Sequence, residues 1–340
     1  MIALQLPAHP HCHTEAMSAA VNWMERRQIA LYLLALAVGV ATGLLIPAVA
    51  DPAGLAVTPV LGLLLYATFL GVPFGTIGIA LRDWRFLGAV LVLNFLIVPV
   101  VVFVLSRWIA HDQALLIGVL CVLLTPCIDY VIVFTGLAGG AQDRLLAAAP
   151  ILMLAQMLLL PLYLWLFAGA AVVDRVDPAP FVEAFVTLIL IPLGAAALTQ
   201  FAAARVRWGR TLSHVATGSM VPVMMLTLAV VVASQIGGVS DRLGALAPAI
   251  PIYVAFAVLM VPLGAVVSRA AGLDLGGRRA VVFSGVTRNS LVVLPIVLAL
   301  PSGFEIAPLA VVLQTLIELL TMVVLVRALP RLMPQQRGPE

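Results

Sequence analysis

The chain has 340 residues, of which 63% are hydrophobic and only 10% charged, and its mean hydropathy is +1.18. Soluble domains carry about 25% charged residues, because a soluble surface needs polar side chains to cover it. This composition excludes a soluble enzyme, a disordered chain and a disulfide scaffold. The net charge of +3 comes without a dense basic cluster, so we expect no nucleic-acid partner.

In chain order, the apolar residues form runs that are each long enough to cross a bilayer, which takes about 20 residues. The backbone within lipid must satisfy its own hydrogen bonds, so we expect each run to be a helix. The sequence therefore predicts an all-α polytopic membrane protein with ten transmembrane helices. They fall at about 28–50, 55–80, 86–109, 114–138, 144–172, 179–204, 211–237, 246–268, 279–300 and 304–328.

Residues 1–24 are polar and predict a disordered N-terminal tail, and residues 331–340 predict a C-terminal tail. The first tail contains His9, His11, Cys12 and His13, a combination that can bind metal. No second group of ligands with the spacing of a structural site follows, so we predict no metal site. The first apolar run exceeds the 7–15 residues of a signal-peptide core, which favours a retained helix.

The arginines predict the orientation of the helices, because basic residues concentrate in cytoplasmic loops. With the N-terminus inside, the outer loops carry only Arg107, Arg175 and Arg242. The inner segments carry Arg26, Arg27, Arg82, Arg85, Arg144, Arg205, Arg207, Arg210, Arg269, Arg278, Arg279, Arg327, Arg331 and Arg337. We expect a protein of the plasma (cytoplasmic) membrane with both termini in the cytoplasm.

The two halves of the chain resemble each other at an offset of about 160 residues. The fifth run contains Ala149-Pro150 and then Gln156, and the tenth contains Ala307-Pro308 and then Gln314 at the same spacing. Five spans per copy is an odd number, so the copies would cross the membrane in opposite senses, as in many secondary transporters. We predict two inverted five-helix repeats, at residues 25–172 and 173–330.

Charged residues inside membrane helices are costly and therefore mark candidate functional sites. Asp129 follows Pro126 in the fourth span, Arg288 occupies the equivalent stretch of the ninth, and Glu318 lies in the tenth. Breaks at matching places in two repeats point to a binding site. Asp129 and Arg288 would then form either a static ion pair or a working pair, and Asp129 and Glu318 are the candidate proton-coupling groups.

Neutral polar side chains add further candidates around these breaks. Cys127 lies two residues before Asp129, and its thiol is either a soft ligand or a small buried hydrophobe. The candidate substrate-binding residues are Cys127, Arg288, Asn289, Ser290 and Thr125, and the candidate cavity-lining residues are Asn94, Gln156 and Gln314. The same neutral residues also fit hydrogen bonds between helices.

The stretch from Leu123 to Ala138, LLTPCIDYVIVFTGLA, resembles arsenical-resistance permeases of the bile acid:sodium symporter superfamily. The resemblance implies a core domain, in which broken helices four and nine cross, and a panel domain formed by spans one, two, six and seven. It implies efflux of arsenite or a related trivalent metalloid in exchange for protons, with Cys127 as the metalloid contact. Those permeases carry a glutamate in the broken ninth span, whereas the stretch from Thr287 to Pro295 here contains Arg288 and no carboxylate.

Two other functions remain open. Arg288 would clamp a small organic anion in a sodium- or proton-coupled transporter, although a guanidinium at a sodium site repels Na⁺. A membrane enzyme would need a nucleophile and a base, and no such motif is present. We therefore expect a transporter of a small inorganic or organic solute, with H⁺ as the coupling ion and no cofactor.

Overall fold

The computed structural model describes residues 11–71, 82–128, 130–169 and 186–334. These residues form helices and no strand, which confirms the all-α prediction for this part of the chain; their one isolated bridge joins Pro126 to Arg288. The main helices of the first half are α1 (His11–Leu45), α2 (Ala50–Gly71), α4 (Trp84–Val92), α5 (Val98–Ser106), α6 (Gln113–Leu123), α7 (Tyr130–Leu137) and α8 (Gln142–Ala168). Those of the second half are α11 (Ile191–Ala203), α12 (Arg207–Gly218), α13 (Met220–Asp241), α14 (Leu243–Leu246), α15 (Ala249–Ala270), α16 (Leu275–Val286), α17 (Ser290–Leu298) and α18 (Ile306–Leu332).

Six helical segments in the described residues are long and apolar enough to cross a membrane. They are Pro47–Gly71, Trp84–Ile109, Gln142–Ala168, Met220–Asp241, Leu243–Ala270 and Ile306–Leu332, and shorter apolar helices cover Ala30–Leu45, Gln113–Leu123 and Ile191–Ala203. Large apolar side chains such as Leu158, Val258 and Val324 are exposed on these helices, whereas Arg288 is fully buried. Apolar outside and charge inside is the distribution that a lipid solvent favours.

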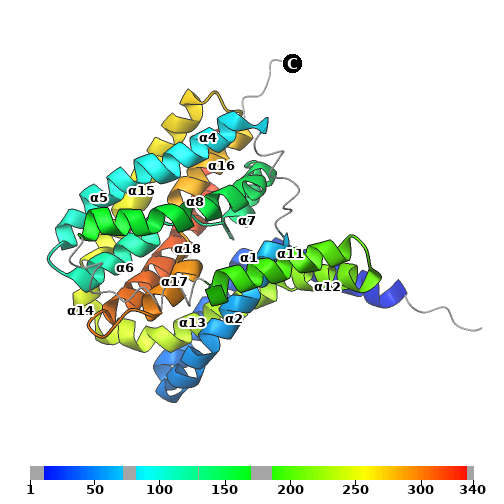
Figure 1. Cartoon of the computed structure of the whole chain (residues 1–340), viewed down its shortest axis with the longest axis horizontal. Coiled ribbons are helices and arrows are strands. Elements are labelled where there is room, and N and C mark those ends of the chain that lie inside the picture. Colours follow the sequence, from blue (N-terminus) through cyan, green and yellow to red (C-terminus); the bar gives the residue numbers. More distant parts are fainter. Residues whose placement is uncertain (1–10, 72–81, 129, 170–185, 335–340) are drawn as a thin grey trace, which may run out of the picture.

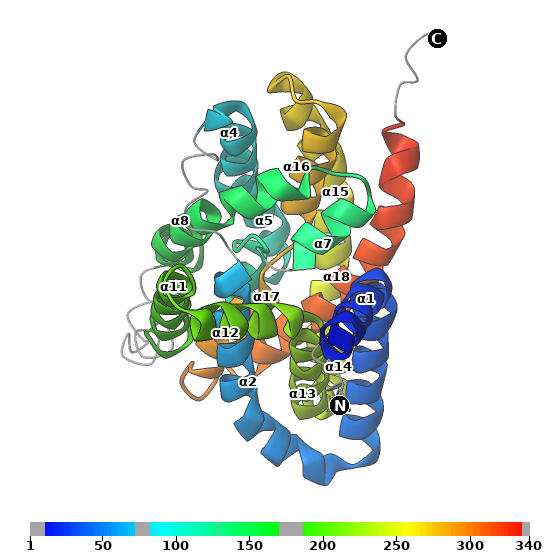
Figure 2. The same ribbon diagram turned by 90° about the vertical axis from the view of Figure 1, so that its right-hand side faces the viewer.

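The helices pack in two groups. In one group, α1 packs on α13, α13 on α2, and α2 on α11. In the other, α15 packs on α16, while α18 packs on α6 and α17, and α8 packs on α6 and α7. Figures 1 and 2 show the two groups side by side, and α13 connects them through its contact with α18.

Small residues bring α1 and α13 together. A Cβ atom at Gly39 would lie 2.8 Å from the carbonyl oxygen of Ala229, and one at Gly43 would lie 2.6 Å from that of Ala233. Residues without bulky side chains at this spacing let two membrane helices approach closely. The backbones of α1 and α13 are therefore in direct contact.

A π-helical turn, η3 (Leu93–Ile97), connects α4 to α5. Pro99 has no backbone N–H, so it cannot donate to the carbonyl of Phe95 four residues earlier. The hydroxyl of Tyr163 on α8 donates to this oxygen at 2.5 Å instead. The turn also contains Asn94, which is fully buried.

Two predicted boundaries are wrong. The seventh span, expected at 211–237, is two helices, because the polar residues of α12 do not extend the apolar run and α13 begins only at Met220. The N-terminal tail is shorter than predicted: α1 begins at His11, since residues 11–24 contain no Gly or Pro and include helix-forming Ala and Met. Residues 1–10 and 335–340 of the predicted tails lie outside the described residues.

Candidate functional site

Two helix interruptions lie against each other in the second group of helices. The first separates α6 from α7, and the second separates α16 from α17. The backbone N–H of Cys127 donates to the carbonyl of Thr287 at 3.3 Å, and that of Asn289 donates to the carbonyl of Thr125 at 2.8 Å. Non-helical backbone at membrane depth needs such partners, and here each interruption supplies them to the other.

Threonines terminate both preceding helices in the same way. The hydroxyl of Thr125 donates to the carbonyl of Cys121 at 2.9 Å, and the hydroxyl of Thr287 donates to that of Phe283 at 2.7 Å. After the second interruption, Asn289 caps α17, since its Oδ1 accepts from the N–H of Val292 at 3.1 Å. Thr125 and Asn289 thus hold the backbone in place.

Arg288 extends from this junction into the protein, with no exposed surface. Its Nη1 donates to the carbonyl of Leu123 at 3.2 Å. Its Nη2 donates to Asn94 Oδ1 at 2.7 Å and to the carbonyls of Ser284 and Gly285 at 2.7 and 2.8 Å. The guanidinium therefore joins η3 to the ends of α6 and α16.

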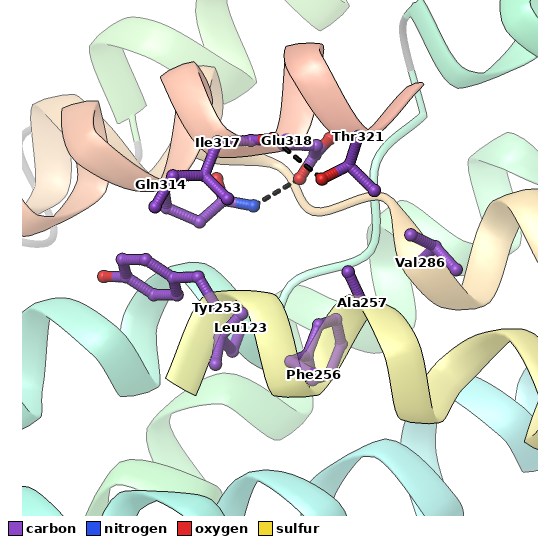
Figure 3. A pocket seen from close by; sticks show the side chains of 9 residues that line it. All are labelled: Leu123, Tyr253, Phe256, Ala257, Val286, Gln314, Ile317, Glu318 and Thr321. Carbon is purple, nitrogen blue, oxygen red and sulfur yellow. Dashed lines mark hydrogen bonds between the residues drawn. The ribbon is translucent and has the colours of Figure 1, made fainter. Parts of the chain in front are cut away.

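Glu318 on α18 is the second buried charged group, and only 4% of its surface is exposed. Tyr130 donates its hydroxyl hydrogen to Oε1 at 2.7 Å, and the backbone N–H of Arg288 donates to Oε2 at 2.9 Å. Gln314 Nε2 also donates to Oε2 from one turn away, as Figure 3 shows. A carboxylate with three donors connects α7 and α18 to the second interruption.

A small cavity of about 10 Å³ lies beside Glu318. Figure 3 shows that its lining side chains come from α15, α18 and the ends of α6 and α16. They are Leu123, Tyr253, Phe256, Ala257, Val286, Gln314, Ile317, Glu318 and Thr321. The carboxylate and the amide of Gln314 are its polar walls, and the rest of the lining is largely apolar.

Two cysteines are buried in this region, and both are fully enclosed. Cys127 lies in the junction itself, whereas Cys121 lies in the last turns of α6. Asp129, the predicted partner of Arg288, lies outside the described residues. Among the residues described, no group of three or more His, Cys, Asp and Glu side chains could hold a metal ion.

Several buried amide groups have no hydrogen-bond partner among the described residues. They include both polar atoms of Gln156 on α8, Oε1 of Gln314 and Nδ2 of Asn289. Natural proteins leave few buried polar atoms unpaired, so each such group calls for a reason. A polar solute entering between the helices would offer them partners.

The structure brings most of the predicted residues into one network. A backbone hydrogen bond links Asn289 to Thr125 at the junction, and two further hydrogen bonds connect Arg288 to Asn94 and to Glu318. Cys127 joins through its backbone, and Ser290 follows Asn289 as the first residue of α17. Gln156 is buried but is not linked to this network by a hydrogen bond among the described residues.

Sequence reasoning missed two further contributors. Tyr130 bonds Glu318, and its hydroxyl in an apolar run was a visible signal. Arg279, counted as an inner-loop charge, is 8% exposed and donates to the carbonyls of Ala138 and Met333 at 2.9 and 2.6 Å. Its role in tying the α7–α8 loop to the end of α18 had no signal in the sequence.

A polytopic helical fold with a buried polar junction between interrupted helices is typical of secondary membrane transporters. The chain belongs to the Sodium Bile acid symporter family, whose sequence model matches residues 58–242. This match includes Asn94, Thr125 and Cys127 and ends before Arg288 and Glu318. A comparison with curated proteins found no match. The chain is therefore a multi-pass membrane protein of a family that transports small solutes.

Proposed function

We propose that this transporter exports arsenite or a related trivalent metalloid in exchange for protons. The observation that carries the proposal is the position of Cys127, a buried thiol within the junction of the two interruptions. Thiolate is a soft ligand, and it therefore suits a soft ion such as a trivalent metalloid. Unpaired amides at Gln156, Asn289 and Gln314 would hydrogen-bond the hydroxyl groups of such a solute.

Exchange for protons needs a carboxyl group that alternates between charged and neutral forms. Glu318 fits because it is buried, lines a cavity and contacts the junction through Arg288. Its Tyr130 partner donates in the present arrangement and can accept if Glu318 takes a proton. Asp129 is the other proposed proton-coupling group.

The architecture that we propose is two inverted five-helix repeats. In support, α8 and α18 are both 27 residues long, and α2 and α13 are both 22. The first group of helices, containing α1, α2, α11 and α13, would be the panel, and the second group would be the core. Transport would follow from movement of one group against the other, with both termini in the cytoplasm and the protein in the plasma membrane.

The two buried cysteines provide a matched test of the thiol. In an arsenite-sensitive host, we expect the wild-type chain and Cys121→Ala to restore growth on arsenite, and Cys127→Ala to lose at least about 90% of the transport rate. The physical reason is that only Cys127 lies in the junction, so only its loss removes the soft ligand. Growth and uptake into everted vesicles are measured together with the amount of protein in the membrane.

Equal protection by Cys127→Ala and Cys121→Ala would contradict the thiol role. The second candidate function, coupled transport of a small organic anion, is favoured by the buried cation at Arg288. Only Nε of that guanidinium lacks a partner among the described residues, so an anion would bind there or displace an acceptor. Vesicles that accumulate an organic anion and ignore arsenite would establish this alternative.

A further inference from the structure

Four oxygen atoms surround the guanidinium of Arg288. Three are main-chain carbonyl oxygens, of Leu123, Ser284 and Gly285, and the fourth is Oδ1 of Asn94, all at 2.7–3.2 Å. All four groups are uncharged. Neutral carbonyl and amide oxygens converging on one point are the donors with which proteins coordinate hard cations such as those of the alkali metals.

These carbonyls are free because two helices end at the same place. Within an α-helix, each N–H donates to the carbonyl four residues earlier. At the end of α16, the N–H of Arg288 donates to Glu318 and not to the carbonyl of Ser284. The N–H of Asn289 donates to Thr125 and not to the carbonyl of Gly285. At the end of α6, the N–H of Cys127 donates to Thr287 rather than to Leu123. The last carbonyls of a helix carry its partial negative charge, so two negative helix ends face one point.

We propose that this point is a cation site whose occupant is the protein's own guanidinium. Arg288 acts there as a tethered cation, held by four oxygens and by the ring of Phe256, whose centroid is 5.3 Å from Cζ. It does the work that a bound monovalent cation would do in holding η3, α6 and α16 together. The junction therefore needs no dissolved cation at this place.

This role accounts for the arrangement better than substrate binding does. A substrate group has to be released in every transport cycle, whereas four acceptors from three elements hold Arg288 in place. The inference also bears on coupling, and in that respect it rests on the proposed function. Because Arg288 is a fixed cation at the junction, the coupling ion would bind at the carboxyl groups instead. As a statement about the site, it needs no substrate.

The test is chemical replacement of the cation in purified, full-length protein. We expect Arg288→Ala in choline chloride to melt at a lower temperature than the wild type. Guanidinium or Na⁺ at low millimolar concentration should then raise its melting temperature in a saturable manner. The wild type and Arg331→Ala, which removes an exposed arginine, should show no such response. An Arg288→Ala protein that melts like the wild type, or that responds to cations no more than Arg331→Ala, overturns the proposal.

A second pair of variants covers the case in which Arg288→Ala does not fold. Arg288→Lys keeps a tethered charge, and Arg288→Met keeps a similar chain length without charge. We expect the lysine variant to be recovered folded with the higher melting temperature, and equal or reversed stability overturns the inference. Because these measurements use no substrate, failure of arsenite transport and failure of the cation site give different results.

Discussion

At the scale of the residue, the polar centre depends on two buried charged groups that do not form an ion pair within 4 Å. The guanidinium of Arg288 donates to neutral oxygens, while Glu318 accepts from the backbone N–H of the same residue. Each charge is thus satisfied by dipoles, which a low-dielectric interior requires. The two groups are coupled through the backbone of the second interruption.

Glu318→Gln tests this arrangement. Glutamine has one acceptor oxygen and one amino group, so at least one of the three donors to Glu318 loses its partner. We expect a loss of about 1–3 kcal/mol in the free energy of unfolding, the cost of an unpaired buried donor. We also expect transport to lose its dependence on a pH gradient, measured in proteoliposomes.

Glu305→Gln is the control for that variant, since Glu305 is exposed and its Oε1 accepts from the N–H of the nearby Gly303 at 2.9 Å. Its stability and pH dependence should stay near those of the wild type. A Glu318→Gln protein with an unaltered response to the pH gradient would show that Glu318 is not a coupling group.

At the scale of the element, close helix packing depends on where glycine has no room for a side chain. In α1, Gly39 lies against the backbone of α13, whereas Gly62 in α2 has no atom within 4 Å of its Cβ position. The same residue type is therefore essential for packing at one site and dispensable at the other. The π-helical turn η3 is likewise an element-scale feature: Pro99 follows it closely, and the hydroxyl of Tyr163 donates to the carbonyl of Phe95 within it.

Gly39→Ala is expected to lower stability by about 1–3 kcal/mol, because a methyl group forced into packed helices strains them. Its Cβ would lie 2.8 Å from the carbonyl oxygen of Ala229 and 3.0 Å from Cβ of Val232. Gly62→Ala makes the same chemical change without a neighbour and should be neutral. Thermal melts of the two variants in one detergent compare them, and equal melting temperatures would contradict the packing of α1 on α13.

At the scale of the whole molecule, transport by alternating access requires the two groups of helices to move against each other. Their connection through α13 and α18 includes a close approach between Gly238 and Leu309, where a Cβ on the glycine would lie 3.1 Å from Cδ2 of the leucine. A covalent bond at this point would fix the groups in one arrangement.

We expect the double variant Gly238→Cys, Leu309→Cys to form a disulfide on oxidation and to lose most of its transport activity. Reduction should restore the activity, since the bond alone blocks movement. The two single-cysteine variants, treated with the same oxidant, are the controls. Full transport by the cross-linked protein, with the disulfide verified by electrophoresis, would show that these helices do not separate during transport.

The sequence by itself determined the helical membrane class, because composition and run length follow directly from the solvent around the chain. It also predicted the polar centre at residue level: Thr125, Cys127, Arg288, Asn289 and Glu318 stand out since polar residues are rare in apolar runs. Four of these form two hydrogen-bonded pairs, Thr125 with Asn289 and Arg288 with Glu318. The fifth, Cys127, donates its backbone N–H to the carbonyl of Thr287 in the second interruption.

Only the tertiary structure decided what those residues contact. The acceptors of Arg288 are mostly main-chain carbonyls, which every residue carries, so no residue type could reveal them. They become available only because α6 and α16 end side by side and because neighbouring N–H groups donate to Thr125, Thr287 and Glu318 instead. A buried charge can be read from a sequence, but the oxygens that satisfy it depend on where two distant helices stop.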